Sequence, residues 1–275
     1  MRQLRRYQID ALAGDTIIPF AVVARQASTI TGSSSPGLPS VQLTNGNAFT
    51  GRVDLFSLLS TGPQTTGGPN DLQYLGARIS GANLQLVVTT YGAIPNPATQ
   101  EFDFGIFLPG QSSPRYVIFN YDVGLLNGSP YPSGQNATFL LDLGVPPAKQ
   151  HYVQISPFVD SPVFSNFLVD TVPLADIPGG SSSNPVPLTG NIGITVLSYD
   201  LMGNPFETLP PSGNPANFNV TTQKYTPQSL TTTVPPNSTV TVPVTTNPSV
   251  NDDEIGLLGI FRDNPPNQQT QAFTP

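Results

Sequence analysis

Glu101 and Asp103 are the two residues whose types and spacing best fit catalysis. Residues i and i+2 of a strand point to the same face, roughly 7 Å apart along the backbone, and two carboxylates so placed suit the acid and base of a glycoside hydrolase. Phe102 and Phe104 would fill the opposite face, as in any half-buried strand, and the chain has no tryptophan on which a sugar would stack. We therefore expect the pair to be structural and the protein not to be an enzyme.

His151 is the only histidine and stands at the start of a predicted strand. A serine nucleophile would need such a base, but the chain has no Gly-x-Ser-x-Gly turn. One histidine cannot complete the usual catalytic zinc site, and neither lysine follows a phosphate-binding glycine loop. We expect no catalytic residue, no cofactor and no small-molecule substrate.

The only acidic run covers residues 251–254, with the sequence Asn-Asp-Asp-Glu. Oxygen ligands this close together can hold Ca²⁺. The run lacks the spacing of an EF-hand loop, however, and a solvated turn before a strand beginning at Ile255 explains it equally well. Our expectation is that it holds no metal.

Charged residues make up only 10% of the 275 residues, against about 25% in an ordinary soluble domain. So few charges protect poorly against association, which favours a surface that neighbouring subunits cover; an uncharged, robust surface domain is the alternative. The net charge of −7 argues against sequence-specific nucleic-acid binding. The chain has no cysteine, hence no disulfide, and no apolar run long enough to predict a transmembrane helix.

The first thirty residues hold Arg2, Arg5 and Arg6, three of only ten basic residues. With apolar residues between them, these arginines predict a short basic arm that contacts anionic lipid, nucleic acid or an acidic partner subunit; a frayed terminus is the alternative. We expect no Sec signal peptide, because no long apolar run follows the arginines. A composition typical of external proteins without an export signal indicates either release as part of a particle or export by another route, and it points toward a virus structural protein.

Short apolar segments separated by glycine and proline turns predict an all-β protein. Glu101–Phe104 alternates as a half-buried strand should. Two segments also suit short helices, Val53–Ser60 and Asp71–Arg78, the second with Asp71 as its N-cap. The predicted strands are 16–25, 52–59, 84–91, 101–108, 115–121, 137–143, 151–155, 163–169, 192–199, 216–222, 238–244 and 255–261.

Strands of this length and spacing predict an eight-stranded jelly-roll barrel with an additional smaller β domain or tower. A run of small and turn-forming residues marks the linker; a long loop within one domain is the alternative. The expected division is a basic arm over 1–15, the barrel over 16–177, the linker over 178–190, a second small β domain or barrel elaboration over 191–262 and a C-terminal tail over 263–275.

The strand-rich stretch from Thr16 to Val169, the Pro/Thr-rich part after it and the basic arm MRQLRR together resemble the jelly-roll major capsid proteins of tailless icosahedral viruses. The closest style is that of the single vertical-barrel coat proteins of membrane-containing double-stranded DNA phages, the sphaerolipovirus-like group. The resemblance implies an upright barrel, a lattice shared by two coat proteins and a lipid membrane beneath the shell.

The expected function is therefore that of a structural coat protein in the virion, which assembles with itself and with a companion capsid protein over an internal membrane. The alternative is a recognition domain, either of a phage fibre or spike or of a bacterial adhesin. Exposed tyrosines would form its ligand surface, with Tyr116, Tyr121 and Tyr131 as candidates.

Overall fold

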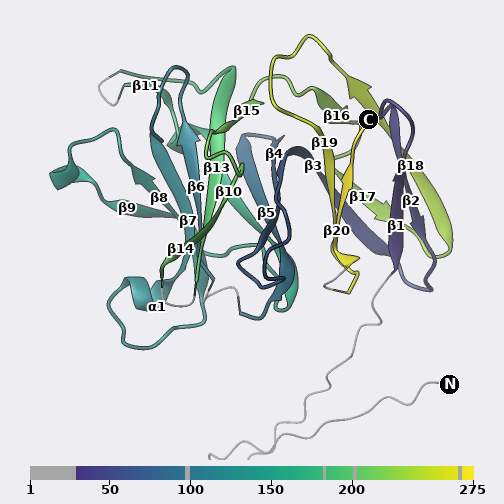
Figure 1. The fold of residues 1–275 in the computed structure, drawn as a ribbon, viewed down its shortest axis with the longest axis horizontal. Coiled ribbons are helices and arrows are strands. Elements are labelled where there is room, and N and C mark those ends of the chain that lie inside the picture. The colour runs from purple at the N-terminus through teal and green to yellow at the C-terminus, as the bar shows by residue number, and fades with distance from the viewer. Residues whose placement is uncertain (1–28, 97–99, 182–183, 201–202, 266–267) are drawn as a thin grey trace, which may run out of the picture.

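The computed structural model is built almost wholly of antiparallel strands (Figure 1). It describes residues 29–96, 100–181, 184–200, 203–265 and 268–275. The predicted strand over 16–25 and the arginines Arg2, Arg5 and Arg6 lie outside these residues. The all-β class predicted from the sequence is confirmed.

Three large sheets form the body, here called sheets A, B and C and defined by their strand orders below. In Figure 1, sheet B lies between sheet C on the left and sheet A on the right. Sheet A has the order β1 (Ile30–Ser34), β2 (Ser40–Asn45), β18 (Ser238–Thr246), β16 (Tyr225–Pro227). Sheet B has the order β10 (Ser165–Pro173), β5 (Asn83–Ile94), β4 (Leu72–Ser80), β3 (Gly51–Thr61), β19 (Gly256–Phe261), β20 (Thr270–Phe273), and β17 (Thr231–Val234) also pairs with β3.

Sheet C has the order β14 (Pro205–Leu209), β13 (Asn191–Tyr199), β6 (Phe102–Phe107), β7 (Tyr116–Asp122), β8 (Asn136–Asp142), β9 (Tyr152–Ser156), and β15 (Ala216–Asn219) also pairs with β13. A separate hairpin joins β11 (Gly179–Ser181) to β12 (Asn184–Val186). The helical elements are single turns: α1 (Val123–Leu126), η2 (Pro147–Lys149) and η3 (Leu174–Asp176).

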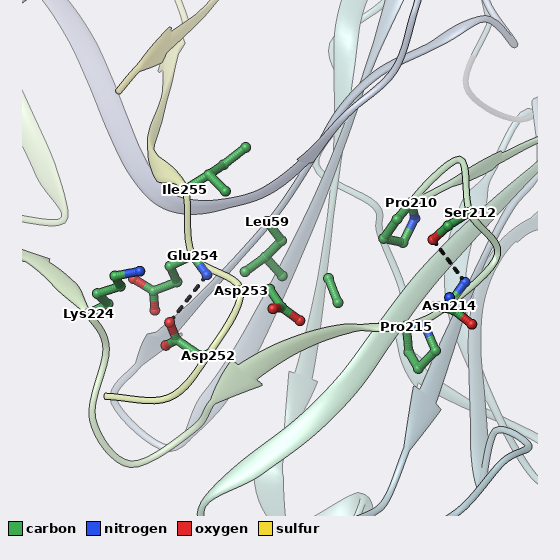
Figure 2. Close-up of a pocket in the computed structure, with 11 residues that line it drawn as sticks. Leu59, Pro210, Ser212, Asn214, Pro215, Lys224, Asp252, Asp253, Glu254 and Ile255 are labelled. Carbon is green, nitrogen blue, oxygen red and sulfur yellow. Dashed lines mark hydrogen bonds between the residues drawn. The ribbon is translucent and has the colours of Figure 1, made fainter. Parts of the chain in front are cut away.

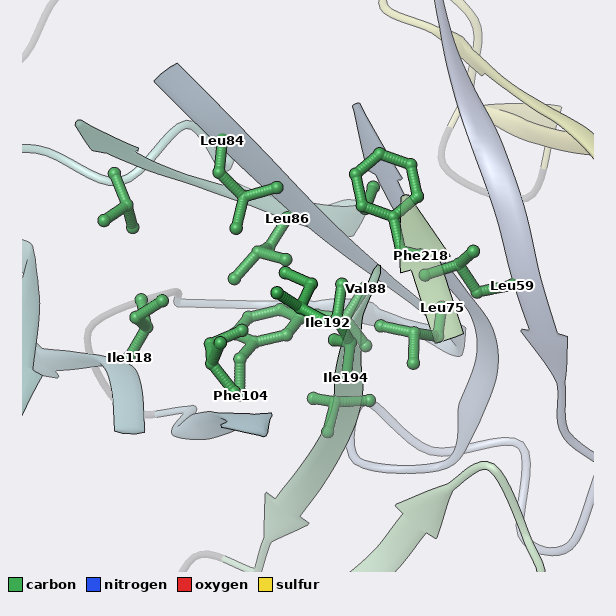
Figure 3. Close-up of a cluster of buried hydrophobic side chains, with 14 of the residues drawn as sticks. Leu59, Leu75, Leu84, Leu86, Val88, Phe104, Ile118, Ile192, Ile194 and Phe218 are labelled. Carbon is green, nitrogen blue, oxygen red and sulfur yellow. The ribbon is translucent and has the colours of Figure 1, made fainter. Parts of the chain in front are cut away.

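Sheet B carries a hydrophobic core on each of its faces. Ser57 of β3 lies opposite Ala77 on one side and Leu257 on the other, so these residues share a face. Ala77 belongs to the cluster shared with sheet C, shown in Figure 3, and Leu257 to the cluster shared with sheet A. One face of sheet B therefore packs against both other sheets.

The opposite face of sheet B holds a third cluster, in which Phe56 and Phe167 are the largest side chains. The two end strands of the sheet approach each other around it: Asn166 of β10 donates from Nδ2 to Thr270 Oγ1 of β20 at 3.1 Å. The Asn166 N–H also donates to Gln269 Oε1 at 3.1 Å. Sheet B is thus strongly curled, and its two ends are joined by side chains rather than by strand pairing.

Both predicted helices are wrong, since Val53–Ser60 lies in β3 and most of Asp71–Arg78 lies in β4. β3 is buried on both faces, so its continuous apolar run has no period that separates helix from strand. Asp71 caps a loop instead of a helix: its Oδ2 accepts the backbone N–H groups of Thr65, Thr66 and Gly67 at 2.9, 2.6 and 2.5 Å.

The predicted eight-stranded jelly roll is not confirmed. Strands that precede the predicted linker pair with strands that follow it: β6 pairs with β13, and β3 with β19. The predicted linker contains the β11–β12 hairpin. The predicted tail contains β20, because Phe273 buries its ring: it is 2% exposed and packs against Phe261.

Replacing Phe273 with alanine should lower the free energy of unfolding by about 3–5 kcal/mol, the usual cost of emptying a buried phenylalanine site. Gly32 leaves the space that the ring occupies, since a Cβ there would lie 2.4 Å from the Phe273 ring. The matched control is Phe158→Ala, because Phe158 is 71% exposed and should change stability by no more than about 0.5 kcal/mol. Urea unfolding measures both; equally small losses would show that β20 is not part of the core.

Candidate functional site

Glu101 and Asp103 lie side by side on the outer face of sheet C, as their spacing predicts. Phe102 and Phe104 point the other way, into the core shared with sheet B. The Tyr199 hydroxyl, at the end of β13, donates to Asp103 Oδ2 at 2.9 Å. The acid pair is therefore held by two neighbouring strands of one sheet.

The acid pair shares a proton in weakly acidic solution. Burial, and then the charge of Asp103, raises the pKa of Glu101 to about 7. Burial also raises the pKa of Asp103 to about 6, against the lowering effect of the Tyr199 hydrogen bond. No N–H or hydroxyl donor of the described residues reaches the buried Asp103 Oδ1. When Glu101 is protonated, its carboxyl O–H is the donor closest in kind and position to fill that place.

A protonated acid beside an ionised one is also the state of a general acid–base pair. The surface around the pair is aromatic: Phe119 lies directly opposite Asp103 on β7, and Tyr121 continues the same face of that strand. Phe119, Tyr121 and Tyr199 are each half-buried. This face of sheet C therefore offers aromatic rings with carboxyl groups among them, a surface suited to contact rather than to a closed core.

A third carboxyl group, that of Asp170, is fully buried between sheets B and C. Thr138 of β8 donates a hydrogen bond to its Oδ1, while Oδ2 has no hydrogen-bond partner among the described residues. Burial raises the pKa of Asp170 to about 7, although the Thr138 hydrogen bond opposes the rise. Asp170 therefore stays neutral in weakly acidic solution and links the two sheets through one polar contact.

Asp252, Asp253 and Glu254 of the acidic run line a pocket of about 440 Å³, which Figure 2 shows. Their carboxylates bind different segments: Asp253 Oδ2 accepts from the Asn217 N–H at 2.7 Å, and Glu254 Oε2 from the Tyr225 N–H at 2.9 Å. Burial raises the pKa of Glu254 to about 7. No group of three or more acidic, histidine or cysteine side chains within the described part of the chain is arranged to hold a metal ion.

Sequence reasoning missed a buried charge cluster around Asp54, which is completely shielded from solvent. Arg262 binds its carboxylate directly, and Arg52 and Arg78 approach it to 3.3 and 3.7 Å. Arg78 also lies 4.1 Å from the centre of the Phe56 ring. Although burial opposes it, the charge of Arg262 holds the pKa of Asp54 below its usual value. The cluster covers the third core and is structural.

The other predicted residues lie apart from the acid pair. His151 is exposed immediately before β9. Tyr116 is buried in the core, where its hydroxyl donates to the Pro178 carbonyl at 2.7 Å. Tyr121 lies on the outer face of sheet C, and Tyr131 is 76% exposed in the loop before β8. The three tyrosines therefore do not form one ligand surface.

An exposed apolar region surrounds β9. Gln135 Nε2 donates to the Pro157 carbonyl at 3.1 Å, which joins the loop before β8 to the segment after β9. A hollow of about 450 Å³ lies between them. Six of the ten large apolar side chains that are exposed on the described surface belong to this region, here called the β9 rim: Tyr131, Tyr152, Val153, Phe158, Val163 and Phe164.

No protein-family model matches the chain, no curated protein matches its sequence and no solved structure matches its fold. The molecule is thus an all-β, antiparallel protein of several sheets for which these comparisons identify no family or homologue. No helix of the described segments is long and apolar enough to cross a bilayer.

The raised carboxyl pKa values make stability depend on pH with a definite sign. Glu101, Asp103, Asp170 and Glu254 bind protons more tightly in the folded protein, so their contribution is full below about pH 4 and is lost as the pH rises through about 6 to 7. The melting temperature should therefore fall between pH 5 and pH 8, and Asp103→Asn should flatten that fall.

Asp176→Asn serves as the matched control, because Asp176 is exposed and its replacement should leave the slope unchanged. Below about pH 4 the trend should reverse, because the pKa of Asp54 is lowered and its contribution is lost on protonation. A melting temperature that rises steadily from pH 5 to pH 8 would contradict the protonated pair.

Proposed function

We propose that this chain is a structural coat subunit of an icosahedral virus particle, which assembles laterally with copies of itself and with a companion coat protein. The observation that carries the proposal is the β9 rim, on a chain with few charges. Monomeric soluble proteins rarely leave large apolar side chains clustered on the surface. A shell subunit keeps such surface for its neighbours.

The distribution of charge supports a role for the N-terminal segment. Residues 1–28 hold four arginines and two aspartates, a net side-chain charge of +2, whereas residues 29–275 hold six basic and fifteen acidic residues, a net charge of −9. A basic arm on an acidic body suits contact with a partner subunit or with anionic lipid beneath the shell. Arg2, Arg5 and Arg6 are the residues proposed for that contact.

The fold itself does not support the proposal. The coat proteins that the sequence resembles have an upright jelly-roll barrel, and such a barrel is not confirmed for this chain. The strand orders of sheets B and C combine segments from both halves of the chain. The proposal rests on the surface: a body with several sheets, few charges and an apolar rim. Its localisation would be the virion.

A recognition domain of a phage fibre or an adhesin is the second candidate, and one observation favours it. Phe119, Tyr121 and Tyr199 lie half-buried around the Glu101–Asp103 pair on the outer face of sheet C. Aromatic rings beside carboxyl groups suit a sugar, whose rings stack and whose hydroxyls donate hydrogen bonds. Glycan binding that is lost in Tyr121→Ala, in a protein that stays monomeric, would favour this candidate.

The purified protein should associate in a concentration-dependent manner. Burial of the β9 rim removes apolar surface from water, and about 25 cal/mol is gained for each Å² removed. Multi-angle light scattering from micromolar to millimolar concentration should show a rising mass. A protein that stays monomeric throughout, both alone and with a companion coat protein, would remove the proposal.

Replacing Arg2, Arg5 and Arg6 together with glutamine should weaken binding to vesicles of anionic lipid. Each arginine near such a surface contributes about 1 kcal/mol, so the loss should be on the order of a hundredfold at low ionic strength and should shrink as salt screens the charges. Vesicle co-sedimentation across a salt series measures this, with neutral-lipid vesicles as the control. Equal binding of both proteins at low salt would show that these arginines make no lipid contact.

A further inference from the structure

β9 is the outer edge strand of sheet C and pairs with β8 alone among the described strands. Tyr152, Val153 and Gln154 are all exposed, although consecutive strand residues point to opposite faces. The first three residues of β9 are therefore exposed on both faces, whereas Ile155 is half-buried against the core shared by sheets B and C. No described strand pairs with the outer edge of β9. The backbone along that edge keeps N–H and C=O groups that no described strand satisfies.

Exposed edges of this kind are normally protected by lysine, by proline or by a covering segment. The five residues of β9, Tyr-Val-Gln-Ile-Ser, contain neither a charge nor a proline. Lys149 lies in η2, before the strand begins. β9 is five residues long and its register against β8 shifts between Thr138 and Phe139, but its edge carries neither lysine nor proline. Such an edge with apolar residues on it can be a template for another strand.

We propose that β9 pairs with β9 of a second copy of this chain, antiparallel about a two-fold axis, so that two C sheets become one continuous sheet. The inference deepens the proposed function, on which it rests, by naming the lateral contact. A two-fold axis places the same strand on both sides of the interface.

Charge favours a second copy as the partner. Two bodies of net charge −9 repel each other, and their approach is easiest where acidic groups are absent. Residues 143–159, which include β9, contain no aspartate or glutamate, and Asp160 just beyond them is bound by Arg262. In an antiparallel pair centred on Gln154, the two Lys149 side chains would lie about 30 Å apart along the strands. No like charges would meet.

The outer face of sheet A is also free of charge but lacks the apolar surface. Its exposed residues are mainly threonines and other small polar groups, such as Thr44 and Thr239, whose hydroxyls lie 2.9 Å apart in a hydrogen bond. Hydroxyl groups remain well hydrated, so their burial contributes little. Of these two uncharged surfaces, only the one at β9 also has large exposed apolar side chains. Sheet A therefore supplies an uncharged control position for cross-linking.

A single cysteine tests the contact directly, because the chain has none of its own. Directly opposed residues of an antiparallel pair have Cα atoms about 4.5–5.5 Å apart, within the range of a disulfide. Under mild oxidation, Gln154→Cys, which faces its own copy in a pair centred on this residue, should form a disulfide-linked dimer in high yield. Thr241→Cys, at an exposed position on sheet A, is the control and should stay monomeric on a non-reducing gel. Equal cross-linking at Gln154→Cys and Thr241→Cys, or none at Gln154→Cys, would overturn the proposal.

A charge exchange identifies the partner. Val153→Lys and Val153→Glu should each weaken association tenfold or more, since like charges then meet across the interface, and mixing the two variants should restore it. Val186→Lys is the matched control, because Val186 is exposed to a similar degree (46% against 59%) on the β11–β12 hairpin. Circular dichroism and melting temperature confirm that each variant is folded.

The outcomes separate this inference from the proposed function. Association of the wild type that neither Val153 variant weakens would overturn the β9 contact and leave the coat subunit in place with another interface. Loss in both variants without recovery on mixing would show that β9 docks against a different strand, and this also overturns pairing between copies. A wild type that never associates would remove both proposals.

Discussion

Sheet B packs on both faces, and the remainder of the molecule depends on this arrangement. One face buries the cores shared with sheets A and C, while the other closes around Phe56 and Phe167. Such a sheet cannot slip in register without exposing one core or another. The open part of the third core is covered by Arg78 and Arg262, which the single buried carboxylate of Asp54 holds in place. The result is a rigid centre that leaves the outer faces of sheets A and C for contacts.

Those two outer surfaces differ in chemistry. Sheet A presents hydroxyl groups, whereas sheet C presents half-buried aromatic rings around the Glu101–Asp103 pair and ends in the open edge of β9. The protons held by the buried acids reduce the negative charge of the body in weakly acidic solution. Association through sheet C should therefore become easier as the pH falls, because fewer ionised carboxyl groups repel the approaching copy. In the proposed assembly, the same acids would connect the stability of the body with the contact between copies.

Local alternation made β6 and its acid pair predictable, because Phe102 and Phe104 face the core while Glu101 and Asp103 do not. β3 could not be told from a helix, since burial on both faces leaves its apolar run without a period. The sequence gives little sign of β20, because its four residues contribute a single buried aromatic ring and its role depends on pairing with β19. Tyr199, which binds Asp103, and Arg262, which binds Asp54, lie about a hundred or more residues from their partners in sequence. Contacts of that range leave no mark on a single sequence.

Electron microscopy of particles purified from the source of the protein would test whether copies of this chain form a shell and meet at β9. We expect a closed lattice whose subunit density accommodates the three-sheet body, with two β9 strands adjacent across local two-fold axes. Particles that lack the protein, or a lattice in which β9 faces solvent on every subunit, would contradict this expectation.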